Sequence, residues 1–292
     1  MNEESLRLFG KGNNFLQDNN YNKALGEFLK AEVLGLEHEE LFNNIGLIYD
    51  IKGNYSEAIR YYQKAILINS DYAMVYNNLG YTYNNKREYE IAIEVLKHAI
   101  KLDSCNKLTY NNLGYSYKNL GKYEEAIYYY TKAIEVDPEY CLAYYNMGIA
   151  YYNKEDFIKA IDCYTKAIKL NDSISEIYRS MGVALNKIQK YSEALESFNK
   201  ALFIRPDNPE TLIEIANTYD YIGNYQAAIE NYTKAINLFP EYFEAYNNLG
   251  CTYLKTGQQD LAIKAFKKAI LINPQHTNIY DNLVTLYKNT LD

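Results

Sequence analysis

Apolar residues in this chain fall on helix faces, and the faces come in pairs. One stripe has the three-one-three step of an α-helix and consists of Phe42, Ile45, Gly46 and Tyr49. A second helical stripe follows: Tyr55, Ala58, Ile59, Tyr62, Ala65 and Ile66. Gly53 separates the two, where a left-handed residue would end a helix. This stretch therefore predicts a helix, a turn and a second helix.

Small residues repeat this unit along the chain with a period of 34 residues. One register holds Gly12, Gly46, Gly80, Gly114, Gly148, Gly182, Ala216 and Gly250. A fixed period of this size indicates a solenoid, which we predict to be one domain over residues 1–292. The predicted units are residues 5–38, 39–72, 73–106, 107–140, 141–174, 175–208, 209–242 and 243–276, with a C-terminal capping helix at 277–291.

The recurring glycines need a packing reason, because glycine inside a helix costs up to about 1 kcal/mol relative to alanine. Antiparallel helices lie roughly 8–10 Å apart, and a glycine that faces an alanine permits the near end of that range. We therefore expect Gly80 to contact the helix that carries Ala92, and the other units to repeat this contact.

The pattern resembles the tetratricopeptide repeat over essentially the whole chain. That motif is a large aromatic residue, Leu-Gly and Tyr, followed by Ala, an aromatic residue, Ala and Pro. The matching residues of one unit are Tyr110, Leu113, Gly114, Tyr117, Ala126, Tyr130, Ala133 and Pro138. The chain departs from the family in having no Trp. The resemblance implies an all-α, right-handed superhelix, with first helices lining a concave groove and second helices forming the convex back.

Composition argues against several classes of protein. A net charge of −7 disfavours a nucleic-acid surface, which needs a basic stripe. No apolar run approaches the roughly 20 residues that span a bilayer, and the first residues do not form a secretory signal, so we expect a cytoplasmic protein. The four cysteines lack metal-ligand spacing, and His38, His98 and His276 share no acidic cluster. We expect no cofactor, no metal and no catalytic activity.

A row of asparagines is the main candidate site. Two residues before the recurring small position stand Asn44, Asn78, Asn112, Asn146, Asn248 and Asn282. An amide side chain offers both a donor and an acceptor to an extended backbone, which would meet one asparagine roughly every three residues. The row is similar to the asparagine ladder in the repeat region of O-linked N-acetylglucosamine transferases, which implies peptide-backbone binding for these six residues. The alternative is family consensus without a ligand.

Three further groove residues are candidates. Tyr81 and Tyr115 are predicted either to contact a ligand or to pack between adjacent repeats. Arg179 could hold a ligand carboxylate or pair with a glutamate of an adjacent helix. The carboxylate clamp of chaperone-binding repeats is not matched, because its Lys and Arg positions hold Asn43, Met74, Leu108 and Asn112. We therefore do not expect a chaperone C-terminus as the partner.

The leading functional hypothesis is a non-enzymatic scaffold that holds an extended peptide or partner segment in its groove. A second hypothesis is the substrate-recognition arm of a larger enzyme, such as a glycosyltransferase. A third is structural self-assembly, in which the end repeats of one molecule stack on those of another.

Overall fold

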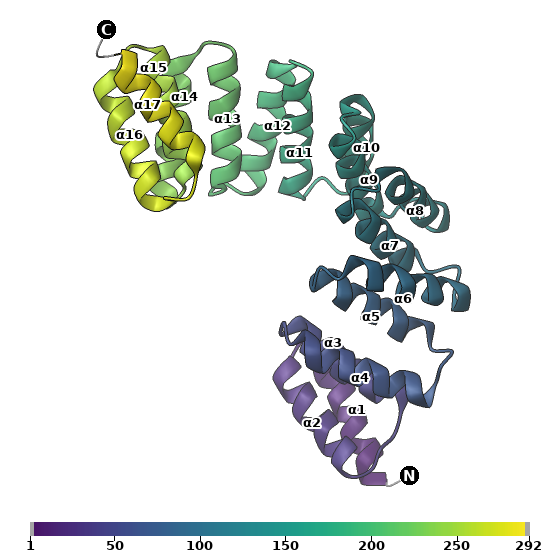
Figure 1. The fold of residues 1–292 in the computed structure, drawn as a ribbon. Helices are drawn as coiled ribbons and strands as arrows, with labels where there is room; N and C mark the ends of the chain where they lie inside the picture. The colour runs from purple at the N-terminus through teal and green to yellow at the C-terminus, as the bar shows by residue number, and fades with distance from the viewer. Residues whose placement is uncertain (1–2, 290–292) are drawn as a thin grey trace. The chain divides into compact units, whose positions relative to one another are not determined.

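The computed structural model describes residues 3–289, with the backbone alone at residues 278, 285 and 287–289. These residues form seventeen α-helices and no strand (Figure 1). The first helices of the units are α1 (Glu3–Gln17), α3 (Glu39–Ile51), α5 (Ala73–Asn85), α7 (Lys107–Asn119), α9 (Cys141–Asn153), α11 (Ser175–Lys187), α13 (Pro209–Tyr221), α15 (Phe243–Lys255) and α17 (Thr277–Asn289). The second helices are α2 (Tyr21–Val33), α4 (Tyr55–Ile68), α6 (Tyr89–Leu102), α8 (Tyr123–Val136), α10 (Phe157–Leu170), α12 (Tyr191–Ile204), α14 (Tyr225–Leu238) and α16 (Gln259–Ile272).

The predicted all-α class of repeated helix-turn-helix pairs is confirmed. From Glu39 onward each first helix begins one sequence period after the previous one, and the second helices keep the same step from Tyr21 onward. The helices gather in two compact units, Met1–Ala150 and Tyr151–Asp292. One continuous solenoid over residues 1–292 stays a prediction.

The turn inside each repeat is fixed by a residue with positive φ. Gly53 has φ +73°, and its N–H donates to Asp50 O while the N–H of Asn54 donates to Tyr49 O. This pair of hydrogen bonds is a Schellman motif, which satisfies carbonyls that the end of a helix leaves unpaired. The side chain of Asn54 then accepts a hydrogen bond from the backbone N–H of Glu57 and caps α4. The same turn therefore ends one helix and starts the next.

The recurring glycines lie in the contact between the two helices of a pair. Gly80 does contact α6, the helix that carries Ala92, as predicted. The side chain against it is Leu96, whose Cδ2 would lie 2.6 Å from a Cβ at position 80. Tyr62 takes the equivalent place against Gly46. The glycines thus leave room for a large core side chain of the partner helix.

The last helix covers the eighth repeat. Ile279 and Leu286 of α17 are buried in a cluster with Phe266 and Ala262 of α16. Val284, which occupies the glycine register in α17, is exposed. The predicted cap extended to residue 291, and residues 290 and 291 lie outside the described residues.

Candidate peptide-binding face

The candidate site lies on the first helices, which contact one another directly within each compact unit. In residues 1–150, α3 contacts α5 and α5 contacts α7, and in residues 151–292, α11 contacts α13 and α13 contacts α15. No two second helices make contacts as extensive in the described part of the chain. We call the surface of the first helices that carries the predicted asparagines and tyrosines the inner face. It consists of Asn44, Asn78, Tyr81, Asn112, Tyr115 and Asn146 in the first unit, and Asn248 and Asn282 in the second.

The predicted asparagines are joined from repeat to repeat by hydrogen bonds between their amides. In the first unit, the Nδ2 group of one asparagine donates to the Oδ1 atom of an asparagine in the preceding repeat. The bonds run from Asn44 to Asn13 (3.1 Å), Asn78 to Asn43 (2.9 Å), Asn112 to Asn77 (3.0 Å) and Asn146 to Asn111 (2.9 Å). The row is therefore part of the contact between repeats.

Bonds within repeats connect several of these amides into one chain. Asn77 donates to Asn78 and Asn43 donates to Asn44, both at 3.3 Å. A head-to-tail relay of six amides results, in the order Asn112, Asn77, Asn78, Asn43, Asn44 and Asn13. Such chains strengthen their members cooperatively and fix the orientation of each amide.

The relay leaves part of the hydrogen-bonding capacity of the half-buried asparagines unused. An amide nitrogen carries two hydrogens and an amide oxygen has two lone pairs. The relay uses one hydrogen and one lone pair of Asn78, which is half-buried, and one hydrogen of the half-buried Asn112. Asn44 is buried, with 9% of its surface exposed. Asn78, Asn112 and Asn146 are therefore the members of the first unit that remain accessible to a ligand.

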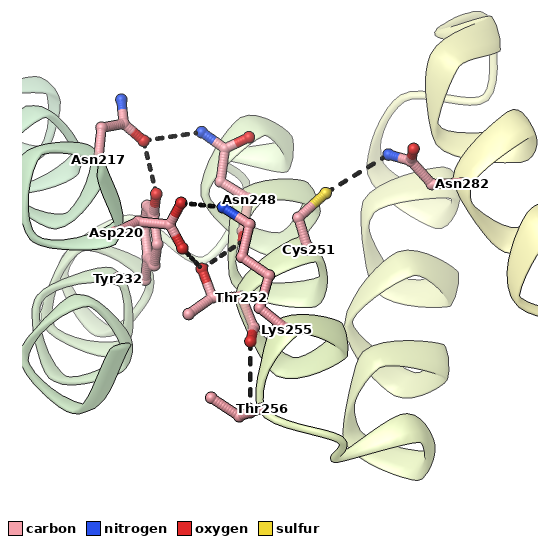
Figure 2. A network of polar contacts seen from close by, with 9 residues as sticks. All are labelled: Asn217, Asp220, Tyr232, Asn248, Cys251, Thr252, Lys255, Thr256 and Asn282. Carbon is pink, nitrogen blue, oxygen red and sulfur yellow. Dashed lines mark hydrogen bonds and ion pairs between the residues drawn. The ribbon is translucent and has the colours of Figure 1, made fainter. Parts of the chain in front are cut away.

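The second unit builds the same kind of network with different residues (Figure 2). Asn248 Nδ2 donates to Asn217 Oδ1 at 3.1 Å, and the hydroxyl of Tyr232 donates to the same oxygen at 2.5 Å. Asn282 Nδ2 donates to Asn247 Oδ1 at 3.0 Å and also lies 3.6 Å from Cys251 Sγ. In the bonds from Asn78, Asn112 and Asn146 the acceptor lies 35 residues before the donor. That spacing would make Ile213 the acceptor for Asn248, and Asn217 lies one helical turn after it.

A second row of bonds between repeats was missed at the sequence level. Hydroxyl groups on first helices bond to a carboxylate or amide of the preceding repeat. The pairs are Thr82 with Asp50 (2.8 Å), Ser116 with Asn84 (2.7 Å), Thr218 with Asn186 (2.8 Å) and Thr252 with Asp220 (3.0 Å). In the sequence, each of these pairs is a polar residue followed 32 positions later by Thr or Ser. Burial raises the pKa of Asp50, while the Thr82 hydroxyl opposes this.

The two predicted tyrosines are accessible on the inner face. Tyr81 is 47% exposed and Tyr115 is 36% exposed. The Lys118 ammonium lies 4.4 Å from the centroid of the Tyr115 ring, within the range of a cation–π interaction. Burial lowers the pKa of Lys118. Both rings therefore keep exposed surface.

Arg179 does not make, with the described residues, the ion pair that was one of its two predicted roles. Glu176, which lies on the same helix as Arg179, pairs with Arg205 at 2.7 Å. The charge of Arg179 lowers the pKa of Glu214, against a larger opposing effect of burial. Arg179 is half-buried.

Metal sites and membrane-spanning helices are the other features to consider in residues 3–289. Between residues 3 and 289, no group of three or more His, Cys, Asp or Glu side chains is arranged to hold a metal ion. Within the same range, each helix is too short or too polar to cross a membrane.

Comparison with known families identifies the repeats. Models described as tetratricopeptide repeat match residues 39–72, 73–104, 108–140, 141–173 and 243–276, and one described as TPR repeat matches residues 216–257. Together they cover well over half of the chain. The chain therefore belongs to the tetratricopeptide repeat family. These are models of a repeat that generally serves as a protein-interaction module, and none of them is a model of an enzyme.

Solved structures share the fold. MamA is 26% identical, over 56% of this chain and 95% of MamA, with a TM-score of 0.52. YrrB, described as a TPR protein with an unusual peptide-binding site, is 24% identical over 65% of this chain and 97% of YrrB, with a TM-score of 0.52. A tetratricopeptide repeat protein from Parabacteroides merdae is 19% identical over 85% of this chain and 98% of its own, with a TM-score of 0.66. A comparison with curated proteins found no match.

Proposed function

We propose that this chain is a non-catalytic scaffold that binds an extended segment of a partner protein along the inner face of its first unit. The observation that carries the proposal is the amide relay. It holds Asn78 and Asn112 in fixed orientations with unused hydrogen-bonding capacity, beside the exposed rings of Tyr81 and Tyr115.

The free capacity of these amides matches an extended backbone. The N–H and C=O groups of a helix are bonded to each other except at its ends. An extended segment offers its own N–H and C=O groups to neighbours, as a strand does at a sheet edge. The Asn78 side chain has one free donor hydrogen and one free acceptor lone pair, so it can pair with both kinds of backbone group. The orientation of the amide is set before binding, which lowers the entropic cost of association.

The tyrosines supply contact area next to the polar row. Tyrosine combines a large apolar ring with a polar tip, and it is enriched where proteins recognise one another. Tyr81 and Tyr115 lie one period apart, at the same register of consecutive repeats. A segment that follows the asparagines would therefore meet a ring in each of these repeats.

This fold is also compatible with two other functions. The asparagine row would also suit the substrate-recognition arm of a larger enzyme such as a glycosyltransferase, and the end repeats would suit self-assembly. The scaffold is preferred because the groups of the inner face suffice for binding a segment without a second domain or a second copy. YrrB has a peptide-binding site by its description, and at 24% identity its likeness to this chain is one of fold.

Peptide selection from a random display library, followed by affinity measurement, tests the proposal. The double variant Tyr81→Ala/Tyr115→Ala should bind the selected peptides at least about tenfold more weakly, a loss of about 1.4 kcal/mol. The matched control is Tyr128→Ala, on the second helix α8, where the ring is 56% exposed. This variant should bind as wild type does. Equal affinities for the double variant and wild type, with helicity unchanged, would contradict the proposal.

A further inference from the structure

A cavity opens on the first helices of the second compact unit. Its volume is about 380 Å³. The residues that give it its chemistry are Tyr152, Asn186, Lys187, Tyr191, Glu214 and Tyr221. We call it the Glu214 cavity. All of these residues lie between positions 152 and 221, in helices α9, α11, α12 and α13.

Glu214 stands at the register that asparagine occupies in six other repeats. It lies one period before Asn248, and a carboxylate there replaces an amide. An ionised carboxylate accepts hydrogen bonds and donates none, so it cannot extend an amide relay. The bond from Asn248 is accepted by Asn217 of this repeat. The Glu214 side chain makes its hydrogen bond within its own repeat, with Asn217, and none with another repeat among the described residues.

Few interactions offset the burial of the Glu214 carboxylate. It accepts one long hydrogen bond, from Asn217 Nδ2 at 3.4 Å, and it has no ion pair with any described residue. Arg179 and Lys187 act on it only at a distance, by lowering its pKa, and the larger effect of burial raises that pKa. A part-buried acid without an ion pair costs stability, which a cation bound beside it would recover.

Tyrosine side chains share the cavity with this acid. Tyr152, Tyr191 and Tyr221 line the same cavity. The charge of Glu214 is one of the causes that raise the pKa of Tyr152 and of Tyr221, after burial, so both phenols lie within its electrostatic reach. Aromatic faces attract cations, and most strongly where water is excluded. The cavity therefore combines an acid with ring faces.

We propose that the Glu214 cavity binds an arginine side chain of the partner segment, with its guanidinium on the carboxylate and against the tyrosine rings. Arginine fits better than lysine because its planar group stacks on aromatic rings, bonds a carboxylate through two N–H groups and is more weakly hydrated. The positive charges of Arg179 and Lys187 act against any cation here. The ligand must therefore gain from stacking and hydrogen bonds as well as from charge.

This inference rests on the proposed function for the identity of the ligand as a partner segment, but the cavity can be tested by itself. The probe is N-acetyl-arginine methylamide, titrated into the ¹⁵N-labelled full chain and followed by the backbone amide signals of Asn186, Asn217 and Tyr221. The matched probe is N-acetyl-citrulline methylamide, which has nearly the same shape without the charge. Wild type should bind the arginine probe at least tenfold more tightly than the citrulline probe.

Variants then assign the binding to the carboxylate. Glu214→Gln keeps the shape of the side chain, and should reduce the preference for arginine over citrulline to near one. Glu196→Gln, which changes an exposed acid on α12, should keep the preference at its wild-type value. Equal binding of the two probes to wild type would overturn the inference, and so would a preference that survives Glu214→Gln in a variant with unchanged helicity.

The two proposals fail in different ways. Loss of peptide binding to the Tyr81 and Tyr115 surface would leave the arginine preference of the cavity intact. Selected peptides that bind the first unit normally, together with no arginine preference at Glu214, would overturn this inference and leave the scaffold standing.

Discussion

Asn112 Nδ2 lies 3.0 Å from Asn77 Oδ1, although the two residues are 35 positions apart in the chain. Asn77 is 6% exposed and sits at the interface of two repeats, while Asn112 reaches the inner face. The asparagines that were expected either to contact a ligand or to be family consensus without a ligand therefore join the repeats. The same bonds that hold the repeats together orient the amides that would contact a partner.

The first prediction concerns the stability that the relay provides. Asn77→Ala removes two hydrogen bonds, the one accepted from Asn112 and the one donated to Asn78, and should cost about 1–3 kcal/mol. For a chain of this size the midpoint of thermal unfolding should fall by about 2–4 °C for each kcal/mol. Circular dichroism melting curves measure the change. Asn22→Ala, at an exposed position of α2, is the control and should stay within about 0.5 kcal/mol of wild type.

The second prediction compares two glycines of one helix. A Cβ at Gly12 would overlap the ring of Phe28, which is fully buried and has no room to move. Gly12→Ala should therefore cost about 1–3 kcal/mol through overpacking, despite the better helix propensity of alanine. Gly10 has no neighbour within 4 Å of its Cβ position, and Gly10→Ala should stabilise α1 by up to about 1 kcal/mol. A gain in stability for both variants would contradict the packing role assigned to the recurring glycine.

Sequence periodicity predicted the helix pairs because each repeat carries the same local signals. The positive-φ turn at Gly53 and the stripe that ends at Ile66 depend only on residues near them in the chain. The contact of Gly80 with α6 was predicted as well, but the side chain in contact was not. The small register at Ala92 recurs visibly, whereas Leu96 stands at a register that holds Tyr or Phe in other repeats.

The partners of the candidate residues could not be read from the sequence. Asn44 and Asn78 share a register, yet Asn44 is buried and Asn78 is half-buried, because burial depends on how neighbouring repeats pack. The bond from Asn248 to Asn217 depends on which turn of α13 presents an amide oxygen, which a strict repeat period does not reveal. Arg179 was expected either to hold a ligand carboxylate or to pair with a glutamate of an adjacent helix, and no such pair forms among the described residues. Glu176, which lies on the same helix as Arg179, pairs with Arg205.

The third prediction follows from Asp50, a buried acid that accepts a hydrogen bond from Thr82 at 2.8 Å. Burial raises its pKa, so the folded state holds the proton more tightly than the unfolded state does. Stability contributed by the protonated form is therefore present at low pH and is lost as pH rises through the folded-state pKa. Asp50→Asn keeps an acceptor for Thr82 and removes the buried charge. It should raise the unfolding midpoint at pH 7 by more than at pH 3.

Measuring the same two midpoints for Asp18→Asn provides the control, since Asp18 is exposed. An effect of Asp50→Asn that is equal at both pH values would show that the carboxylate is not destabilised by burial.

The fourth prediction uses the cysteines, which are all free thiols. Cys163 is 3% exposed, and burial raises its pKa to about 12, whereas Cys105 is exposed. The thiolate is the reactive form, so iodoacetamide at pH 8 should label Cys105 first and Cys163 last in the folded protein. Mass spectrometry of tryptic peptides over time gives the order. Labelling of Cys163 at the rate of Cys105 would contradict its placement in the core.

The central claim is that the inner face binds a segment through its backbone, and an ester scan of a selected peptide tests this most directly. Replacing one backbone amide at a time by an ester removes a single N–H donor and weakens the adjacent carbonyl acceptor. The account predicts periodic losses of about threefold to tenfold at positions that face Asn78, Asn112 and Asn146, as expected for single hydrogen bonds of about 1 kcal/mol. An affinity that no ester changes, but that side-chain substitutions abolish, would contradict it.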